Sequence, residues 1–220
     1  MSKKATVTRE ELVENIRFLN LIMDTPVMKY AHAYLVRTGK TKNTTRESFI
    51  RELSDKWFKL YSRKARNDSS GFEHVFIGEI KEETHEIVGF HNWIRLYLEE
   101  RKGALNYLGY IKPKRRALDP SIHGPANEQL ITMILFEWKG ARKPVSSSLV
   151  GTSPEFEIAL YTMCFMAGQH NVANVLQLGP YQVGITCHTW PLNLHPGQPH
   201  LSIDHGTYSN YMLLNFLAGS

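Results

Sequence analysis

The sequence predicts an α+β fold in which helices precede antiparallel sheets. Apolar residues at helical spacing dominate the first 62 residues, whereas short apolar runs bounded by turn residues are common after residue 104. Helices and strands that are segregated along a chain, rather than alternating, are typical of α+β proteins. We expect the 220 residues to form one domain of two lobes, about 1–118 and 119–220, because a Pro- and charge-rich loop at 112–127 forms a natural boundary.

Three helices are predicted at the start of the chain. Thr8 and Glu11 form a capping-box pattern, which is followed by apolar residues at helical spacing. Pro26 suits the first turn of a second helix, and Gly39 ends that helix. The pattern 44–47 (TTRE) repeats the capping signal before a third apolar periodic segment.

The later elements are mostly strands with two more helices between them. Residues 90–102 have helical spacing and end at Gly103, while Ser153 and Pro154 begin a helix that ends at Gly168. Strands are expected at 105–111, 130–138, 145–150 and near Tyr208, with a turn over 139–144 and a hairpin over 172–190.

Composition excludes several classes of protein. An apolar fraction of 42% with 11% aromatic residues is too high for a disordered chain, and no apolar run approaches the ~20 residues that span a bilayer. Cys164 and Cys187 can form at most one bridge, and we expect both to be free and partly buried. The first residues lack the apolar segment of a secretory signal, which favours an intracellular protein, in the cytoplasm or nucleus; secretion of a longer form stays open.

Two of the ten histidines lie in settings that suit proton transfer. His74 lies in an apolar segment between Glu73 and Glu79, and His91 lies near a predicted helix N-terminus. Cleavage of RNA by its own 2′-hydroxyl needs a base, an acid for the leaving 5′-oxygen and a fixed positive charge at the phosphate. A helix N-terminus favours neutral imidazole and carboxylates favour its protonated form, so His91 is the expected base and His74 the acid, with the reverse assignment left open. A purely structural role for each histidine is the alternative.

Four sequence blocks carry a resemblance to a known family. They are 69–76 (SSGFEHVF), 89–93 (GFHNW), 143–147 (KPVSS) and 151–157 (GTSPEFE). With 57–63 and 97–101, these blocks resemble the EndoU family of poly(U)-specific endoribonucleases over roughly residues 9–190. The resemblance implies a two-lobed fold with a catalytic cleft between the lobes. It also implies cleavage of single-stranded RNA 3′ of uridine, which leaves 2′,3′-cyclic phosphate and 5′-hydroxyl ends.

The resemblance also implies roles for individual residues. The family's catalytic trio corresponds to His74, His91 and Lys143, and its supporting acids correspond to Glu73 and Glu79. The histidines would lie in the N-terminal lobe and Lys143 in the C-terminal one.

Uracil binding is implied for two further residues. Ser147 would read the edge of the base by hydrogen bonding, and the ring of Tyr208 would stack on it, with Tyr211 as the competing aromatic. The sequence departs from the family at Ser146, where a glycine is usual, and in the Gly-Thr-Tyr block that contains Tyr208.

Partners and cofactors follow from the charge and the resemblance. A net charge of +5 and the basic run 112–116 favour an anionic partner. With the resemblance, we expect this partner to be single-stranded U-containing RNA. We also expect the protein to be a monomer that does not bind membranes. The resemblance implies Mn²⁺ as a required or stimulatory cofactor, or Ca²⁺ instead, although no spacing of His, Asp and Glu predicts its site. The alternatives are an RNA-binding module that has lost cleavage and a metal-dependent phosphodiesterase.

Overall fold

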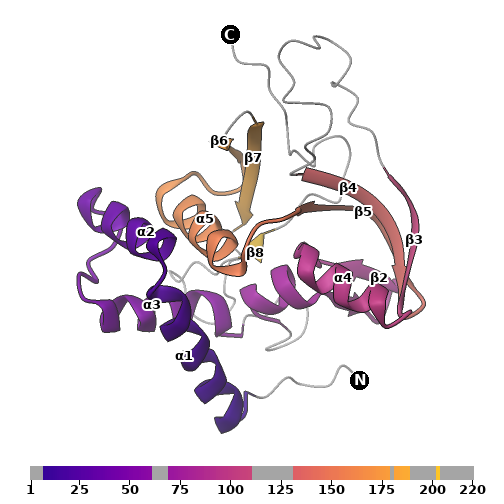
Figure 1. Cartoon of the computed structure of the whole chain (residues 1–220), viewed down its shortest axis with the longest axis horizontal. Coiled ribbons are helices and arrows are strands. Elements are labelled where there is room, and N and C mark those ends of the chain that lie inside the picture. Colours follow the sequence, from indigo (N-terminus) through magenta and orange to yellow (C-terminus); the bar gives the residue numbers. More distant parts are fainter. Residues whose placement is uncertain (1–6, 61–68, 111–130, 179–180, 189–201, 204–220) are drawn as a thin grey trace. The chain divides into compact units, whose positions relative to one another are not determined.

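The computed structural model describes residues 7–60, 69–110, 131–178, 181–188 and 202–203 (Figure 1). The chain forms two compact units whose segments interleave along the sequence. Unit 1 comprises residues 1–73, 153–171 and 187–202, and unit 2 comprises residues 74–152, 172–186 and 203–220. The predicted lobe boundary near residue 118 and the strand predicted near Tyr208 lie outside the described residues.

Unit 1 is helical in its described part. The three helices predicted at the start of the chain are confirmed as α1 (Arg9–Met23), α2 (Pro26–Arg37) and α3 (Arg46–Phe58), and the helix predicted from Pro154 is α5 (Pro154–Ala167). The predicted capping box is present, because Thr8 Oγ1 accepts a hydrogen bond from Glu11 N and the Glu11 carboxylate accepts one from Thr8 N.

The core of unit 1 forms where α1 packs against α3 and α2 packs against α5. Trp57 is fully buried, and its indole Nε1 donates a 2.9 Å hydrogen bond to Thr162 Oγ1 on α5. Cys164 and Cys187 are free, as predicted, and both are buried. Burial raises the pKa of the Cys164 thiol to about 12 and raises that of Cys187 as well, so both behave as apolar core residues.

Unit 2 contains a five-stranded sheet. Its strands are β1 (Glu79–Lys81), β2 (Glu86–Val88), β3 (Leu105–Tyr110), β4 (Ile131–Trp138) and β5 (Ala141–Leu149), in the order β1-β2-β5-β4-β3. Three of its pairings are antiparallel, as predicted, but β2 pairs with β5 in parallel, so the prediction of antiparallel sheets is wrong at that pair. A long connection through α4 (Trp93–Arg101), β3 and β4 separates the two strands, as parallel neighbours require.

A second sheet joins β6 (Ala173–Leu178), β7 (Tyr181–His188) and β8 (Ser202–Ile203) in that order. β6 and β7 are antiparallel, which confirms the predicted hairpin. Helices and sheets together confirm the α+β class. No helix in the described ranges is long and apolar enough to cross a membrane.

The prediction placed β5 too late in the sequence. The turn after β4 contains only Lys139 and Gly140, whereas the prediction extended it to residue 144 because of Pro144. Pro144 is accommodated within the strand by a β-bulge: Lys143 pairs with Phe136 and Ser146 pairs with Ile134, so β5 advances three residues while β4 advances two.

Helix α4 (Trp93–Arg101) begins three residues later than predicted. Asn92 is its N-cap, and the Asn92 side-chain oxygen accepts a 3.0 Å hydrogen bond from Arg95 N. Phe90 has a φ of +64°, in the left-handed region, and therefore cannot belong to the helix. The consequence is that His91 lies just before α4, outside any helix or strand.

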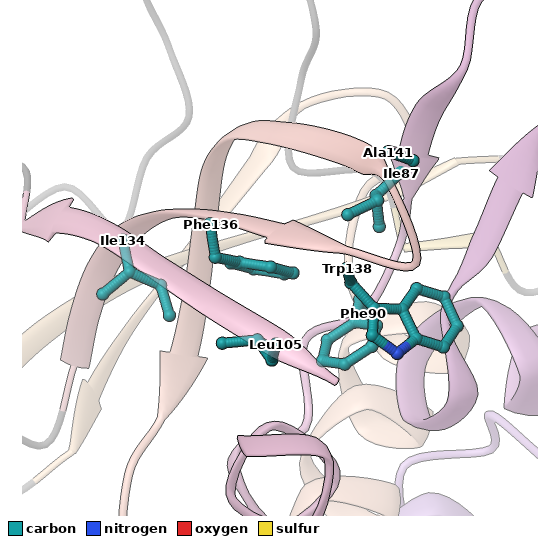
Figure 2. Packing of buried hydrophobic residues seen from close by; sticks show 7 residues of the cluster. All are labelled: Ile87, Phe90, Leu105, Ile134, Phe136, Trp138 and Ala141. Atoms are coloured by element: carbon teal, nitrogen blue, oxygen red, sulfur yellow. The ribbon is translucent and has the colours of Figure 1, made fainter. Parts of the chain in front are cut away.

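Phe90 anchors this segment in the apolar core of unit 2 (Figure 2). Its ring is fully buried, and the centre of this ring lies 4.9 Å from the centre of the Trp138 ring and 5.2 Å from the centre of the Phe136 ring. On α4, the buried Glu99 accepts a 2.8 Å hydrogen bond from Trp138 Nε1 and pairs with Arg95 at 3.0 Å. The Trp138 hydrogen bond and the neighbouring cations lower the pKa of Glu99, so this carboxylate ties α4 to β4 in charged form.

Candidate active site

His74 lies on a single π-helical turn, η1 (Glu73–Ile77), and is only 1% exposed. The turn is stabilised where Glu73 N donates a 3.2 Å hydrogen bond to Ser70 Oγ. Glu79 begins β1, one residue beyond the turn, and its carboxylate oxygen lies 3.6 Å from His74 Nδ1. This contact is an ion pair only when the imidazole is protonated, and π-helical turns are frequent at functional sites.

Backbone hydrogen bonds hold the segment of His91 against η1. Phe90 N donates to His74 O at 2.9 Å, and His91 N donates to Val75 O at 2.9 Å. Asn92 N donates to the same Val75 oxygen at 3.2 Å. The two imidazole rings therefore lie near each other, with centroids 5.7 Å apart and planes inclined by 52°.

This close approach requires a glycine at position 89. A Cβ atom added to Gly89 would lie 1.9 Å from His74 O, well inside van der Waals contact. Gly89 also has a φ of +65°, which side-chain-bearing residues rarely adopt. Any other residue would push the two histidine segments apart.

The ring of His91 is oriented by β5. Its Nδ1 lies 3.2 Å from the backbone oxygen of Ser147, and the ring is 1% exposed. A carbonyl oxygen can only accept a hydrogen bond, so Nδ1 carries the proton in this contact. In the neutral ring, Nε2 then holds the lone pair and can take up a proton.

Lys143 lies on the same strand and is 7% exposed. The bulge at 144–145 places Lys143 opposite Phe136 and Ser146 opposite Ile134, so both point to the face that carries the apolar core. Of the predicted site residues, His74, His91, Lys143, Glu79 and Ser147 all belong to unit 2.

The remaining predicted residues have different settings. Glu73 is half-buried and lies at the start of η1, one residue before His74. Ser147 is buried, and its hydroxyl has no hydrogen-bond partner within the described part of the chain. Tyr208, its competitor Tyr211 and the basic run 112–116 lie outside the described residues.

No group of three or more His, Cys, Asp or Glu side chains that could hold a metal ion occurs within the ranges that the structure describes. The described residues thus indicate no site for Mn²⁺ or Ca²⁺, and a metal cofactor stays a prediction.

Sequence reasoning missed the residues that set the geometry around His91. The sequence did not indicate this role for Gly89, Phe90 or Ser146. One usable signal was present: Asn92 is a typical N-cap residue, so α4 could have been predicted to begin after it. No local pattern indicates that Phe90 adopts a positive φ, because the cause is its long-range packing.

Comparison with known proteins gives consistent results. The sequence matches the family described as Endoribonuclease XendoU over residues 1–199. Poly(U)-specific endoribonuclease-A of Xenopus laevis is 43% identical over 182 residues, which cover 81% of this chain and 60% of that protein. Uridylate-specific endoribonuclease B of Danio rerio is 39% identical over 208 residues, which cover 94% of this chain and 68% of that protein.

A solved structure is also similar. It is titled "The structure of XendoU: a splicing independent snoRNA processing endoribonuclease", and it matches with a TM-score of 0.72 and 40% identity over 90% of this chain and 70% of that one. The fold and site define a mixed helix-and-sheet protein with two adjoining buried histidines. The chain belongs to the XendoU endoribonuclease family, which confirms the resemblance seen in the sequence. It spans about 60% of the length of the first frog relative.

Proposed function

We propose that this chain is a uridine-preferring endoribonuclease that cuts single-stranded RNA 3′ of uridine. The observation that carries the proposal is the pair of buried imidazoles, 5.7 Å apart, with different partners: a carbonyl for His91 and a carboxylate for His74. The names of the relatives, which are uridylate-specific or poly(U)-specific endoribonucleases, support the same reaction.

His91 acts as the base. With its Nδ1 proton directed at the Ser147 carbonyl, Nε2 accepts the proton of the uridine 2′-hydroxyl. The 2′-oxygen then forms a bond to phosphorus, and the bond from phosphorus to the 5′-oxygen breaks. The products are a 2′,3′-cyclic phosphate and a 5′-hydroxyl, so no water is consumed in this step.

His74 acts as the acid and Lys143 stabilises charge. Protonated His74, beside the Glu79 carboxylate, gives a proton to the departing 5′-oxygen. The Lys143 ammonium offsets the negative charge that the phosphate oxygens gain in the transition state, and its burial strengthens this effect.

Preference for uridine is assigned to Ser147. Its buried hydroxyl makes no hydrogen bond within the described residues and therefore has donor and acceptor capacity left for a base edge. Its backbone oxygen already orients His91, so binding of the base and orientation of the catalytic ring would meet at one residue.

The test uses two matched oligonucleotides, one with a single uridine and one with 2′-deoxyuridine at that position. We expect cleavage of the uridine oligonucleotide only, with cyclic phosphate ends identified by mass spectrometry. His74→Ala and His91→Ala should cut it about 10²–10⁴-fold more slowly. Cleavage of the deoxyuridine substrate would instead support a metal-dependent phosphodiesterase. Binding of both oligonucleotides without cleavage would leave an RNA-binding module.

The expected metal dependence is measured in the same assay. Reactions are run with Mn²⁺, with Ca²⁺ and with a chelator, and Mn²⁺ is expected to increase the rate. An equal rate in all three would overturn the expectation of a metal cofactor and leave the histidine mechanism intact.

A further inference from the structure

Ser146 is fully buried on β5, immediately before the residue that binds the ring of His91. Its hydroxyl donates a 3.1 Å hydrogen bond to the backbone oxygen of Phe90. Phe90 directly precedes His91 and has the left-handed backbone described above. A side chain from the strand that carries Lys143 thus reaches the backbone that carries His91.

The peptide group between Phe90 and His91 is fixed from two directions. Its oxygen is bound by Ser146 of β5, and its N–H is bound by Val75 O of η1. Because a peptide group is planar, the plane cannot rotate without breaking both hydrogen bonds. One end of this plane is thereby tied to the element that contains His74 and the other to the strand that contains Lys143.

We propose that Ser146 is a positioning residue, which sets the orientation of His91 toward β5 through the Phe90 carbonyl. The inference rests on the proposed function, because its consequence is the alignment of the base. The bulge in β5 makes the contact possible, because it turns Ser146 to the face of the sheet that carries the apolar core, the same face as Lys143. Two consecutive residues of one strand then hold His91, Ser146 through the backbone and Ser147 through the ring.

The test compares three single variants of the full chain. Ser146→Ala removes the hydroxyl, and Ser146→Cys keeps nearly the same volume but offers only a weak donor. Ser148→Ala is the matched control, because Ser148 is also buried on β5 and its hydroxyl has no hydrogen-bond partner among the described residues.

We expect kcat on the uridine oligonucleotide to fall roughly three- to tenfold in both Ser146 variants, with KM unchanged, as loss of one aligning hydrogen bond predicts. Ser148→Ala should retain the kcat of the original chain. A kcat for Ser146→Ala equal to that of Ser148→Ala would overturn the proposal. A kcat that falls in Ser146→Ala but is normal in Ser146→Cys would overturn it too, because the lost side-chain volume would then be the cause.

A second readout does not depend on cleavage. The ring carbon-bound protons of His91, assigned by their loss in His91→Ala, are followed by NMR in each variant. We expect their chemical shifts to move in Ser146→Ala and to stay in Ser148→Ala; unchanged shifts in both would overturn the proposal. If the original chain cuts no RNA, the proposed function fails, and this measurement alone decides the role of Ser146.

Discussion

The Nδ1 atom of His91 lies 3.2 Å from the backbone oxygen of Ser147. Because that oxygen can only accept, neutral His91 is expected to carry its proton on Nδ1 and to leave Nε2 unprotonated. Long-range ¹H–¹⁵N correlation spectra of the histidine side chains distinguish the two tautomers. A spectrum with the proton on Nε2 would contradict the assignment of His91 Nε2 as the atom that takes up the 2′-hydroxyl proton.

Gly89 is expected to tolerate no side chain. Gly89→Ala introduces a Cβ atom against His74 O, whereas Gly103→Ala is a matched control with a similar φ of +69° and no atom within 4 Å. The control should cost about 1–2 kcal/mol of unfolding free energy from the backbone alone. Gly89→Ala should cost about 1–3 kcal/mol more and lose cleavage. Urea unfolding and initial rates measure both, and equal stability of the two variants would contradict the close packing of the histidine segments.

Lys143 and Lys139 differ in what surrounds them. Lys143 is buried opposite Phe136, whereas Lys139 is exposed, with its ammonium 4.4 Å from the centre of the Trp138 ring. Lys143→Met is expected to lower kcat about 100-fold, as loss of one charge-stabilising group in a buried site does. Lys139→Met should change kcat less than about twofold, given its exposure. The reverse order of effects would place the phosphate contact at Lys139.

Glu99 should make the stability of the chain depend on pH. Folded Glu99 binds its proton more weakly than the unfolded carboxyl, which titrates near 4.5. Its contacts therefore add stability above that pH, and the contribution disappears as the pH falls towards the lower folded pKa. Glu99→Gln should cost about 1 kcal/mol or more at neutral pH and less at pH 3 to 4.

Urea unfolding between pH 3 and 7 measures this difference. Glu100→Gln, at the exposed neighbouring position, serves as the control and should show no pH-dependent cost. A cost for Glu99→Gln that stays constant over the whole range would show that the charge of Glu99 does not hold α4 to β4.

Local signals in the sequence were sufficient for most helices. The capping box at Thr8 and the proline at position 26 act within one helical turn, so the helices they predict are present. Pro144 misled the prediction of β5, because its tolerance depends on a bulge created by pairing with β4. Parallel pairing of β2 with β5 likewise depends on the path of the chain between them, which no local pattern encodes.

The candidate site was predictable in its residue types but not in its geometry. His74, His91 and Lys143 were identifiable by chemistry and resemblance, whereas the contacts of Phe90, Gly89 and Ser146 exist only once distant segments meet. The roles of the three predicted catalytic residues stay predictions until they are tested in the folded chain.

The most direct test of the account uses an RNA in which sulfur replaces the bridging 5′-oxygen after the scissile uridine. A thiolate is a far better leaving group than an alkoxide and needs no acid. We predict that His74→Ala cuts normal RNA about 10²–10⁴-fold more slowly than the unsubstituted protein. On the sulfur substrate, the rate of His74→Ala should be nearly that of the unsubstituted protein, while His91→Ala should be slow on both substrates. Recovery of His91→Ala instead of His74→Ala would contradict the assignment of acid and base.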